Sequence, residues 1–225
     1  MSHIKRTEPI QTVPEIHALL HYLRDWNRNY YIAAMIAIDW GLRCSDVLAL
    51  KIGDVIAGTG KRIQIADRIV IVEQKTGKRR HITIQDKMKD NLHDHIKARR
   101  KKNDVLDLST PLVLSQKRTP DNKPKTITRQ HMSSVINKAA KAVGIRGSIG
   151  THGLRKTFVY QAWKQGVNVD VLQKILGHTS VADTHRYASI PMSFEDEVYK
   201  KINFGLQPGT KKSAKTKWIT TGNGG

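Results

Sequence analysis

The chain has 225 residues, a length that suits one large domain or two small ones. No run of 18 or more apolar residues occurs, which excludes a membrane-spanning helix, and a single cysteine excludes an internal disulfide. Lysine and arginine number 39 against 19 acidic residues, giving a formal net charge of +20. Such an excess repels itself unless a polyanion binds it, so the charge favours a nucleic-acid partner, with a ribosomal or membrane-surface role as the alternative.

The first part of the chain predicts helices. Apolar residues recur at helical spacing over residues 16–23, and residues 30–40 are almost continuously apolar. We expect the second of these helices to be central and buried, and to end at Gly41. Ser45-Asp46 then predicts the cap of a short helix over residues 47–50.

Between residues 52 and 84 the pattern changes to β structure. Two β-rich runs occupy residues 68–72 and 81–84, and the sequence Lys-Thr-Gly-Lys at 75–78 predicts a turn between them. The expected result is a small antiparallel sheet, with residues 62–65 as a candidate third strand.

The chain then returns to helix over residues 86–102, a segment that ends in a basic run. A polar segment at 115–125 contains two prolines and predicts an exposed loop. Thr128 predicts the cap of the next helix, which we expect to run to Val143 and to stop at Gly144.

Three more helices are predicted before residue 190. They cover residues 152–165, a segment to Leu176 capped by Asn168, and a segment through Tyr187 capped by Ser180. An amphipathic helix is expected over 194–204.

Together these elements predict a mainly α fold with a small antiparallel β-sheet, an α+β class. We expect one domain over residues 1–206. Residues 207–225 are rich in glycine, lysine and threonine, and predict a basic, disordered tail.

Three short patterns suggest chemistry only in combination. His152 and Arg155 lie at i and i+3 near a helix start, where the helix dipole favours an anion. His178 occupies a tight corner between two helices, and Tyr187 lies on a short helix. Each feature alone would be an ordinary surface or core residue. Their order is informative, since 23 positions separate Arg155 from His178 and nine separate His178 from Tyr187.

This ordered set, His-x-x-Arg, then Leu-Gly-His, then a tyrosine nine positions on, resembles the C-terminal signature of the tyrosine recombinase, or phage integrase, family. Residues 41–50, GLRCSDVLAL, resemble the first arginine box of that family, with Arg43 as its arginine. Residues 74–80, QKTGKRR, resemble the hairpin that carries the catalytic lysine of the family. Lys75 is the matching position, and Lys78 is the alternative. The resemblance extends from about residue 12 to residue 205.

The resemblance implies a tyrosine recombinase catalytic-domain fold and transfer of a DNA phosphodiester to tyrosine and back. The tyrosine attacks phosphorus, which leaves a 3′-phosphotyrosyl link and a free 5′-hydroxyl, and the reaction needs neither ATP nor a metal. The implied catalytic residues are two phosphate-binding arginines, a hydrogen-bond donor, a base, an acid and the nucleophile: Arg43, Arg155, His178, His152, Lys75 and Tyr187.

Other residues are expected to bind DNA or to be bystanders. Contacts to DNA are expected from the basic loop and the helix that follows it, namely from Lys117, Arg118, Lys125, Arg129 and Gln130. The pairs His17/His21 and His93/His95 lack a further ligand, so we read them as solvated helix faces. We therefore expect no metal and no cofactor.

The resemblance also implies a double-stranded DNA recombination site as the partner, and a homotetramer on DNA. With a charge of +20 we expect mostly monomer in free solution, in a prokaryotic cytoplasm near the nucleoid and not at a membrane. The helix at 194–204 could dock on a neighbouring protomer or fold back on its own domain.

Several alternatives stay open at this point. A type IB topoisomerase-like enzyme shares the chemistry, and a non-catalytic DNA-binding module could share the shape. The sequence does not choose among integration, excision, inversion and resolution. Most family members carry a separate N-terminal DNA-clamping domain that is not seen here. The chain is thus either cut to the catalytic domain or similar to compact members such as fimbrial-switch invertases.

Overall fold

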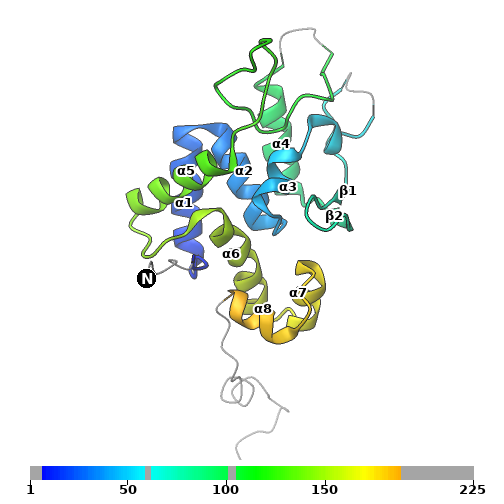
Figure 1. Ribbon diagram of the computed structural model, residues 1–225. Helices are drawn as coiled ribbons and strands as arrows, with labels where there is room; N and C mark the ends of the chain where they lie inside the picture. The colour runs from blue at the N-terminus through cyan, green and yellow to red at the C-terminus, as the bar shows by residue number, and fades with distance from the viewer. Residues whose placement is uncertain (1–6, 59–61, 101–104, 189–225) are drawn as a thin grey trace, which may run out of the picture. The chain divides into compact units, whose positions relative to one another are not determined.

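The computed structural model describes residues 7–58, 62–100 and 105–188 (Figure 1). The predicted helix at 194–204 and the tail from 207 lie outside these residues. Within them the fold is mainly helical with one two-stranded antiparallel sheet, as the sequence predicts. No helix in the described part of the chain is long and apolar enough to cross a membrane.

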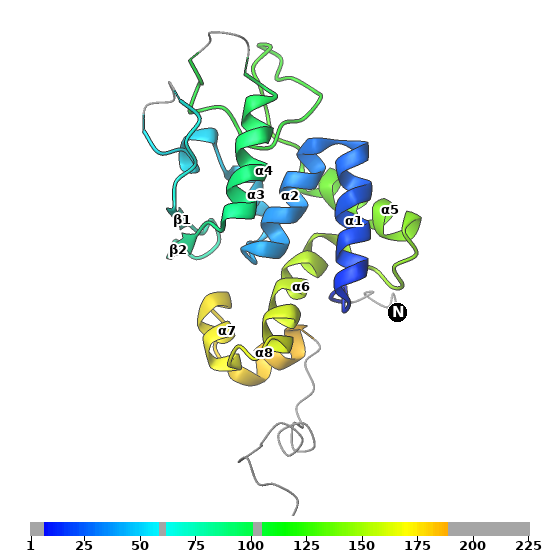
Figure 2. The same ribbon diagram turned by 180° about the vertical axis from the view of Figure 1, so that it is seen from behind.

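Helix α2 (Arg28–Asp39) is the centre of the fold, as its apolar sequence predicts. It packs against α1 (Val13–Trp26) and also against α3, α4, α5 and α6, and it is buried along most of its length (Figures 1 and 2). A capping box of Thr12 and Glu15 starts α1, and the side chain of Asn27 caps α2. Helix α6 in turn contacts the last two helices of the described chain.

The sheet pairs β1 (Arg68–Val72) with β2 (Arg79–Thr83), and Val70 lies opposite His81. The second strand begins two residues earlier than predicted, because the pairing continues toward the turn and joins Val72 to Arg79. The third strand predicted at 62–65 is wrong. An isolated bridge between Ile56 and Ile65 stands in its place, so this segment forms no ladder.

Helix α3 (Cys44–Ala49) starts earlier than predicted, and the expected cap is wrong. Arg43 is the N-cap residue, and its side chain makes no capping hydrogen bond. Asp46 lies inside the first turn and is 1% exposed. Its carboxylate accepts a hydrogen bond of 2.9 Å from the backbone N–H of Gln74, in the turn between the strands. The residue that looked like a helix cap therefore joins the helix to the hairpin.

Helix α4 (Asp86–Lys97) ends before the predicted residue 102. Its buried face stops at Ile96, and Arg99 then turns to donate hydrogen bonds to the carbonyls of Pro111 and Leu112. The reading of His95 as part of a solvated face is also wrong. Its ring is 1% exposed and lies 2.8 Å from the Leu112 carbonyl oxygen, and burial lowers its pKa to about 4.

The second half of the helical fold follows the predicted caps. Thr128, Asn168 and Ser180 each accept a backbone hydrogen bond at a helix start. The predicted loop at 115–125 contains neither helix nor strand, and it is mostly exposed. The helices are α5 (Arg129–Ala142), α6 (Gly150–Lys164), α7 (Val169–Leu176) and α8 (Val181–Ala188).

Residues 7–11 form a strap along α6. The backbone N–H of Ile10 donates to the Thr157 hydroxyl at 2.9 Å, and the Gln161 amide donates to the carbonyls of Ile10 and Gln11. Lys156 donates to the carbonyl of Thr7 at 2.7 Å. The strap lies so close that a Cβ atom on Gly153 would be 2.8 Å from the Glu8 carbonyl oxygen.

The corner between α2 and α3 depends on Gly41. Its φ of +58° lies in the left-handed region, and a Cβ atom added there would lie 2.3 Å from the ring of Phe158 on α6. The corner is therefore pressed against α6. Because Arg43 follows two residues later, this contact fixes the position of the Arg43 backbone.

Replacing Gly41 with alanine should cost ~2–5 kcal/mol in the free energy of unfolding, from the left-handed backbone together with overpacking against Phe158. Gly144 also has a positive φ, of +77°, but nothing lies within 4 Å of an added Cβ. Gly144→Ala is thus the matched control and should cost only ~1–2 kcal/mol. Urea unfolding measures both. Equal losses in the two variants would show that the contact with Phe158 carries no energy.

Candidate active site

Two predicted phosphate-binding arginines converge on one backbone oxygen. Arg43 and Arg155 each donate from Nη2 to the carbonyl of Leu176, at 3.4 and 3.1 Å. Nη1 of Arg155 also donates to the carbonyl of Gly41 at 3.0 Å, and the side chain of Arg155 is almost fully buried. The start of α3, the first half of α6 and the end of α7 therefore meet at these guanidinium groups.

A buried carboxylate that sequence reasoning missed lies between the two arginines. Glu73 is 4% exposed, and its Oε2 lies 2.7 Å from Nη1 of Arg43. Its Oε1 lies 4.0 Å from Nη1 of Arg155, and the Thr76 hydroxyl donates to Oε2 at 2.8 Å. Burial alone would raise the pKa of Glu73, but the hydrogen bonds from Thr76 and Arg43 and the two positive charges outweigh it and lower the pKa. Glu73 is thus an anion at neutral pH.

A third arginine, Arg80 on β2, completes this charged cluster and was also missed. It donates hydrogen bonds to the carbonyls of Trp40 and Gly41, at the same corner that Arg155 contacts. Burial, followed by the charge of Arg155, lowers its pKa to about 10, so Arg80 still carries its charge at neutral pH. In the sequence, only the position of Arg80 in the hairpin, two residues after Lys78, could have indicated a role at the site.

Tyr187 on α8 lies next to both Arg155 and His178. The rings of His178 and Tyr187 meet edge to face, with centroids 5.0 Å apart. Nδ1 of His178 lies 3.1 Å from the Thr184 hydroxyl oxygen, which fixes the orientation of the imidazole. Burial raises the pKa of the Tyr187 phenol, against the opposing charges of Arg155 and Arg43 and a hydrogen bond from Arg155. The phenol is therefore protonated at neutral pH and needs a base before it can attack.

Lys156 is a further cation beside the tyrosine. It is 8% exposed, and its Nζ lies 5.3 Å from the centroid of the Tyr187 ring. The same ammonium donates to the Thr7 carbonyl of the strap. The residue directly after Arg155 thus connects the strap to the aromatic ring, a contact that the sequence pattern does not reveal.

His152, the candidate base, lies in the first turn of α6 and is exposed. Partial burial lowers its pKa, and the charges of Arg129, Arg155, Lys156 and Arg43 lower it further. The ring is therefore neutral at pH 7 and able to accept a proton. No hydrogen bond joins it to Tyr187 among the described residues, so the structure does not pair the predicted base with the predicted nucleophile.

Lys75 lies at the middle of the exposed turn between β1 and β2. Its side chain makes no hydrogen bond to another described residue. The turn itself is held on both sides of Lys75, by the Gln74 N–H bonded to Asp46 and by the Thr76 hydroxyl bonded to Glu73. The alternative, Lys78, is also exposed in the same hairpin. The backbone around Lys75 is thus fixed while its ammonium can move.

The predicted DNA-binding residues gather around the start of α5. Lys117 and Lys125 line a groove of about 260 Å³ with Tyr30 and His131, whose hydroxyl and Nε2 lie 2.8 Å apart. Arg118 is exposed on the same loop. The two remaining residues are exposed in the first turn of α5 and are Arg129 and Gln130.

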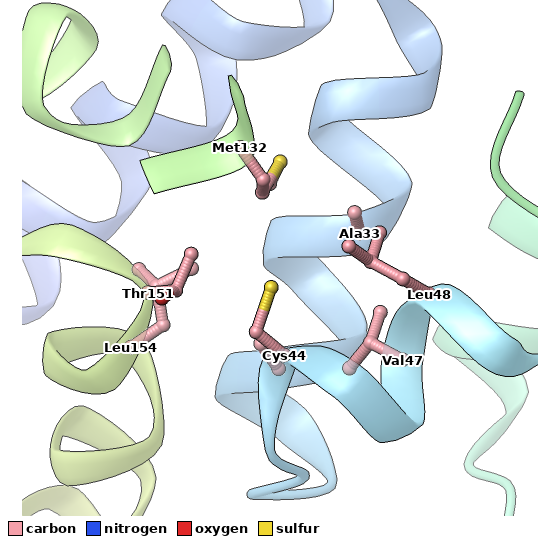
Figure 3. A pocket seen from close by; sticks show the side chains of 8 residues that line it. Ala33, Cys44, Val47, Leu48, Met132, Thr151 and Leu154 are labelled. Carbon is pink, nitrogen blue, oxygen red and sulfur yellow. The ribbon is translucent and has the colours of Figure 1, made fainter. Parts of the chain in front are cut away.

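A small apolar cavity of about 10 Å³ lies between α2, α3, α5 and α6 (Figure 3). Cys44, Thr151 and Leu154 line it together with Met132 of α5. Burial raises the pKa of the Cys44 thiol to about 11, so this neighbour of Arg43 is a protonated packing residue at neutral pH.

Comparison with known proteins gives one family. The sequence profile of the phage integrase family matches residues 11–193. The probable integrase/recombinase YoeC of Bacillus subtilis strain 168 is 32% identical over 193 residues, which cover 86% of this chain and 95% of YoeC. The tyrosine recombinase XerC of Thermodesulfovibrio yellowstonii is 28% identical over 72% of this chain and 50% of XerC. The chain thus spans nearly all of YoeC but half of XerC.

Solved structures give the same fold. The crystal structure of XerA recombinase matches 89% of this chain and 66% of its own, with a TM-score of 0.63 and 20% identity. The catalytic domain of bacteriophage HP1 integrase matches 87% of this chain and 95% of its own, with a TM-score of 0.53 and 21% identity. YoeC and XerC are both named recombinases, so the topoisomerase-like alternative is not favoured.

The electrostatic surroundings of His152 can be tested without DNA. Arg129→Gln removes one of the positive charges that lower its pKa, so the pKa of His152 should rise toward 6.5. Proton–nitrogen NMR of the imidazole across a pH titration measures the change. Arg118→Gln makes the same charge change in the basic loop and should leave His152 unaltered. An equal response to both variants would show that net charge, not the position of Arg129, sets this pKa.

Proposed function

This chain belongs to the phage integrase family of tyrosine-type site-specific recombinases, and we propose that it cleaves and rejoins double-stranded DNA through a covalent bond between Tyr187 and a 3′-phosphate. The observation that carries the proposal is the arginine pair, because Arg43 and Arg155 converge within hydrogen-bond reach of one oxygen while Arg155 also reaches Tyr187. Two guanidinium groups can bind the non-bridging oxygens of one phosphate.

In the proposed first step, the Tyr187 oxygen attacks phosphorus and the bond to the 5′-oxygen breaks. The phenolic proton goes to His152, whose lowered pKa keeps it unprotonated. Lys75 gives a proton to the departing 5′-oxygen. Arg43, Arg155 and His178 stabilise the negative charge that develops on the phosphoryl oxygens. The second step is the reverse attack by a 5′-hydroxyl, and it regenerates the tyrosine without ATP.

We assign DNA contact to the basic residues around the start of α5. The groove between the loop and α5 carries Lys117 and Lys125, and its positive charge suits the phosphates of a duplex on that side of the site. Arg118 belongs to the same patch. The first turn of α5 adds Arg129 and Gln130, which are exposed and free to reach base edges or backbone.

We also propose that the protein forms a homotetramer on DNA and is mostly monomeric in free solution. Its net charge of +20 opposes association until DNA phosphates neutralise it. A lambda integrase tetramer bound to a Holliday junction is among the similar folds, with a TM-score of 0.58. Because the proposed substrate is DNA, we propose that the protein acts in the cytoplasm, at the nucleoid. Docking of residues 194–204 on a neighbouring protomer belongs to this proposal, although that segment lies outside the described residues.

Tyr187→Phe should abolish covalent adducts, because only the nucleophilic oxygen is lost, while DNA binding stays nearly unchanged. The measurement is denaturing electrophoresis of protein mixed with end-labelled duplexes tiled across the DNA that flanks the gene. Tyr199→Phe is the control and should still form the adduct. An adduct in Tyr187→Phe that disappears in Tyr199→Phe would transfer the role to Tyr199.

Lys75→Ala should cleave an ordinary phosphodiester at least ~100-fold more slowly, in line with the loss of a general acid. A substrate with sulfur at the 5′-bridging position should restore the rate, because a thiolate leaves without a proton. Lys78→Ala is the matched control, and sulfur should not alter its rate relative to wild type. Rescue of Lys78→Ala alone would move the acid to that residue, and rescue of neither variant would remove the acid from this hairpin.

A further inference from the structure

We propose that the Glu73 carboxylate is a positioning group that occupies the phosphate position between Arg43 and Arg155 while DNA is absent, and that a DNA phosphate displaces it. The inference rests on the proposed function, since it takes the arginine pair as the phosphate site. It adds a residue and a step: the exchange of an internal anion for the phosphate of the substrate.

Glu73 is hydrogen-bonded to one arginine of the pair and lies at ion-pair distance from the other. One carboxylate oxygen is 2.7 Å from Nη1 of Arg43, and the other is 4.0 Å from Nη1 of Arg155. Both arginines have further acceptors in backbone carbonyls, but Glu73 is the only acidic side chain within ion-pair distance of either one among the described residues. A carboxylate and a phosphate offer guanidinium the same paired oxygen acceptors.

The local charge favours exchange over simple addition. A formal count of the three guanidinium groups of Arg43, Arg80 and Arg155 against the two buried carboxyl groups of Glu73 and Asp46 leaves one positive charge in the cluster. A phosphodiester that replaces Glu73 keeps that sum, and the spare charge can stabilise the second negative charge of the transition state. A phosphate added beside a retained Glu73 would leave no spare charge and would bring two anions together.

The exchange would also act on the turn that carries Lys75. Thr76 donates to the same Glu73 oxygen that contacts Arg43, so the carboxylate joins this turn to the arginine box. When phosphate takes the place of the carboxylate, the turn loses that connection and keeps the one between Gln74 and Asp46. Lys75 is then released to approach the 5′-oxygen only at a site that already holds a phosphate.

The test uses inorganic sulfate as the anion and the full chain without DNA. Glu73→Gln should bind sulfate at least ~10-fold more tightly than wild type, because the competing anion is gone and one charge-assisted hydrogen bond is worth about that factor. Asp25→Asn makes the same change of net charge at an exposed carboxylate on α1 and should bind sulfate as wild type does. Affinity is measured by NMR titration of the arginine side-chain signals.

A purely structural role for Glu73 predicts the opposite result. If the carboxylate only holds the arginines in place, Glu73→Gln loosens them, and sulfate binding is unchanged or weaker, which overturns the proposal. Combining Glu73→Gln with Arg155→Ala should remove the gain in affinity. A gain that survives this second change would mean that sulfate binds elsewhere, which also overturns it.

Two further measurements address folding and the turn. If Glu73→Gln is unstable in low salt, sulfate should raise its melting temperature more than it raises that of wild type, and an equal rise counts against the proposal. Glu73→Asp keeps the charge and should give intermediate sulfate affinity. NMR relaxation of the amides of residues 74–77 should show added motion in Glu73→Gln, and unchanged motion would refute the release of the Lys75 turn.

This result is separable from the proposed function. A Tyr187 adduct in wild type together with unaltered sulfate binding in Glu73→Gln would overturn the proposed displacement of Glu73 and would leave the proposed function intact. Tighter sulfate binding by Glu73→Gln without any Tyr187 adduct in wild type would support the displacement of Glu73 and would overturn the assignment of Tyr187 as the nucleophile.

Discussion

The burial of one guanidinium group organises this fold around its site. Arg155 is 2% exposed, so its N–H groups must find acceptors inside the protein, and an unsatisfied buried charge would cost about 3–5 kcal/mol. The acceptors are the carbonyls of Gly41 and Leu176, with Glu73 nearby. They come from three segments distant in sequence. Folding that satisfies Arg155 therefore assembles the site.

The same requirement explains why the hairpin is attached to the helical part. A two-stranded sheet alone is marginal in water, and this one gains support from the buried side chains of Ile69, Ile71 and Ile82 and from buried polar contacts at its turn. Glu73 and Asp46 bind the turn to the start of α3, while Arg80 binds the second strand to the corner after α2. The two lysine candidates thus lie on an element that apolar packing places against the core and that charged groups attach at its turn.

Local signals in the sequence predict what is local in the structure. Thr128 and Asn168 cap the helices they were expected to cap, because a side-chain oxygen needs only its own backbone to act. Asp46 shows where this reasoning fails, since the same chemistry lets it bind a backbone N–H 28 positions away. Glu73 lies in a β-rich segment and looks like a surface residue. Its role depends on long-range pairing that no spacing rule contains, whereas the ordered His-x-x-Arg, Leu-Gly-His and Tyr pattern is visible because the order itself is a sequence property.

The strap at residues 7–11 has a consequence for mechanical coupling. It is attached to α6 through Thr157 and Gln161, and through Lys156 it reaches the ring of Tyr187. Tension applied to the chain ahead of Thr7 would therefore act on the helix that carries Arg155 and, through the hydrogen bond from the Glu8 N–H to the Ser148 carbonyl, on the segment that leads into that helix. A protein fused at that end by a short rigid linker would act as a lever on the active site, and a long flexible linker would isolate the site from it.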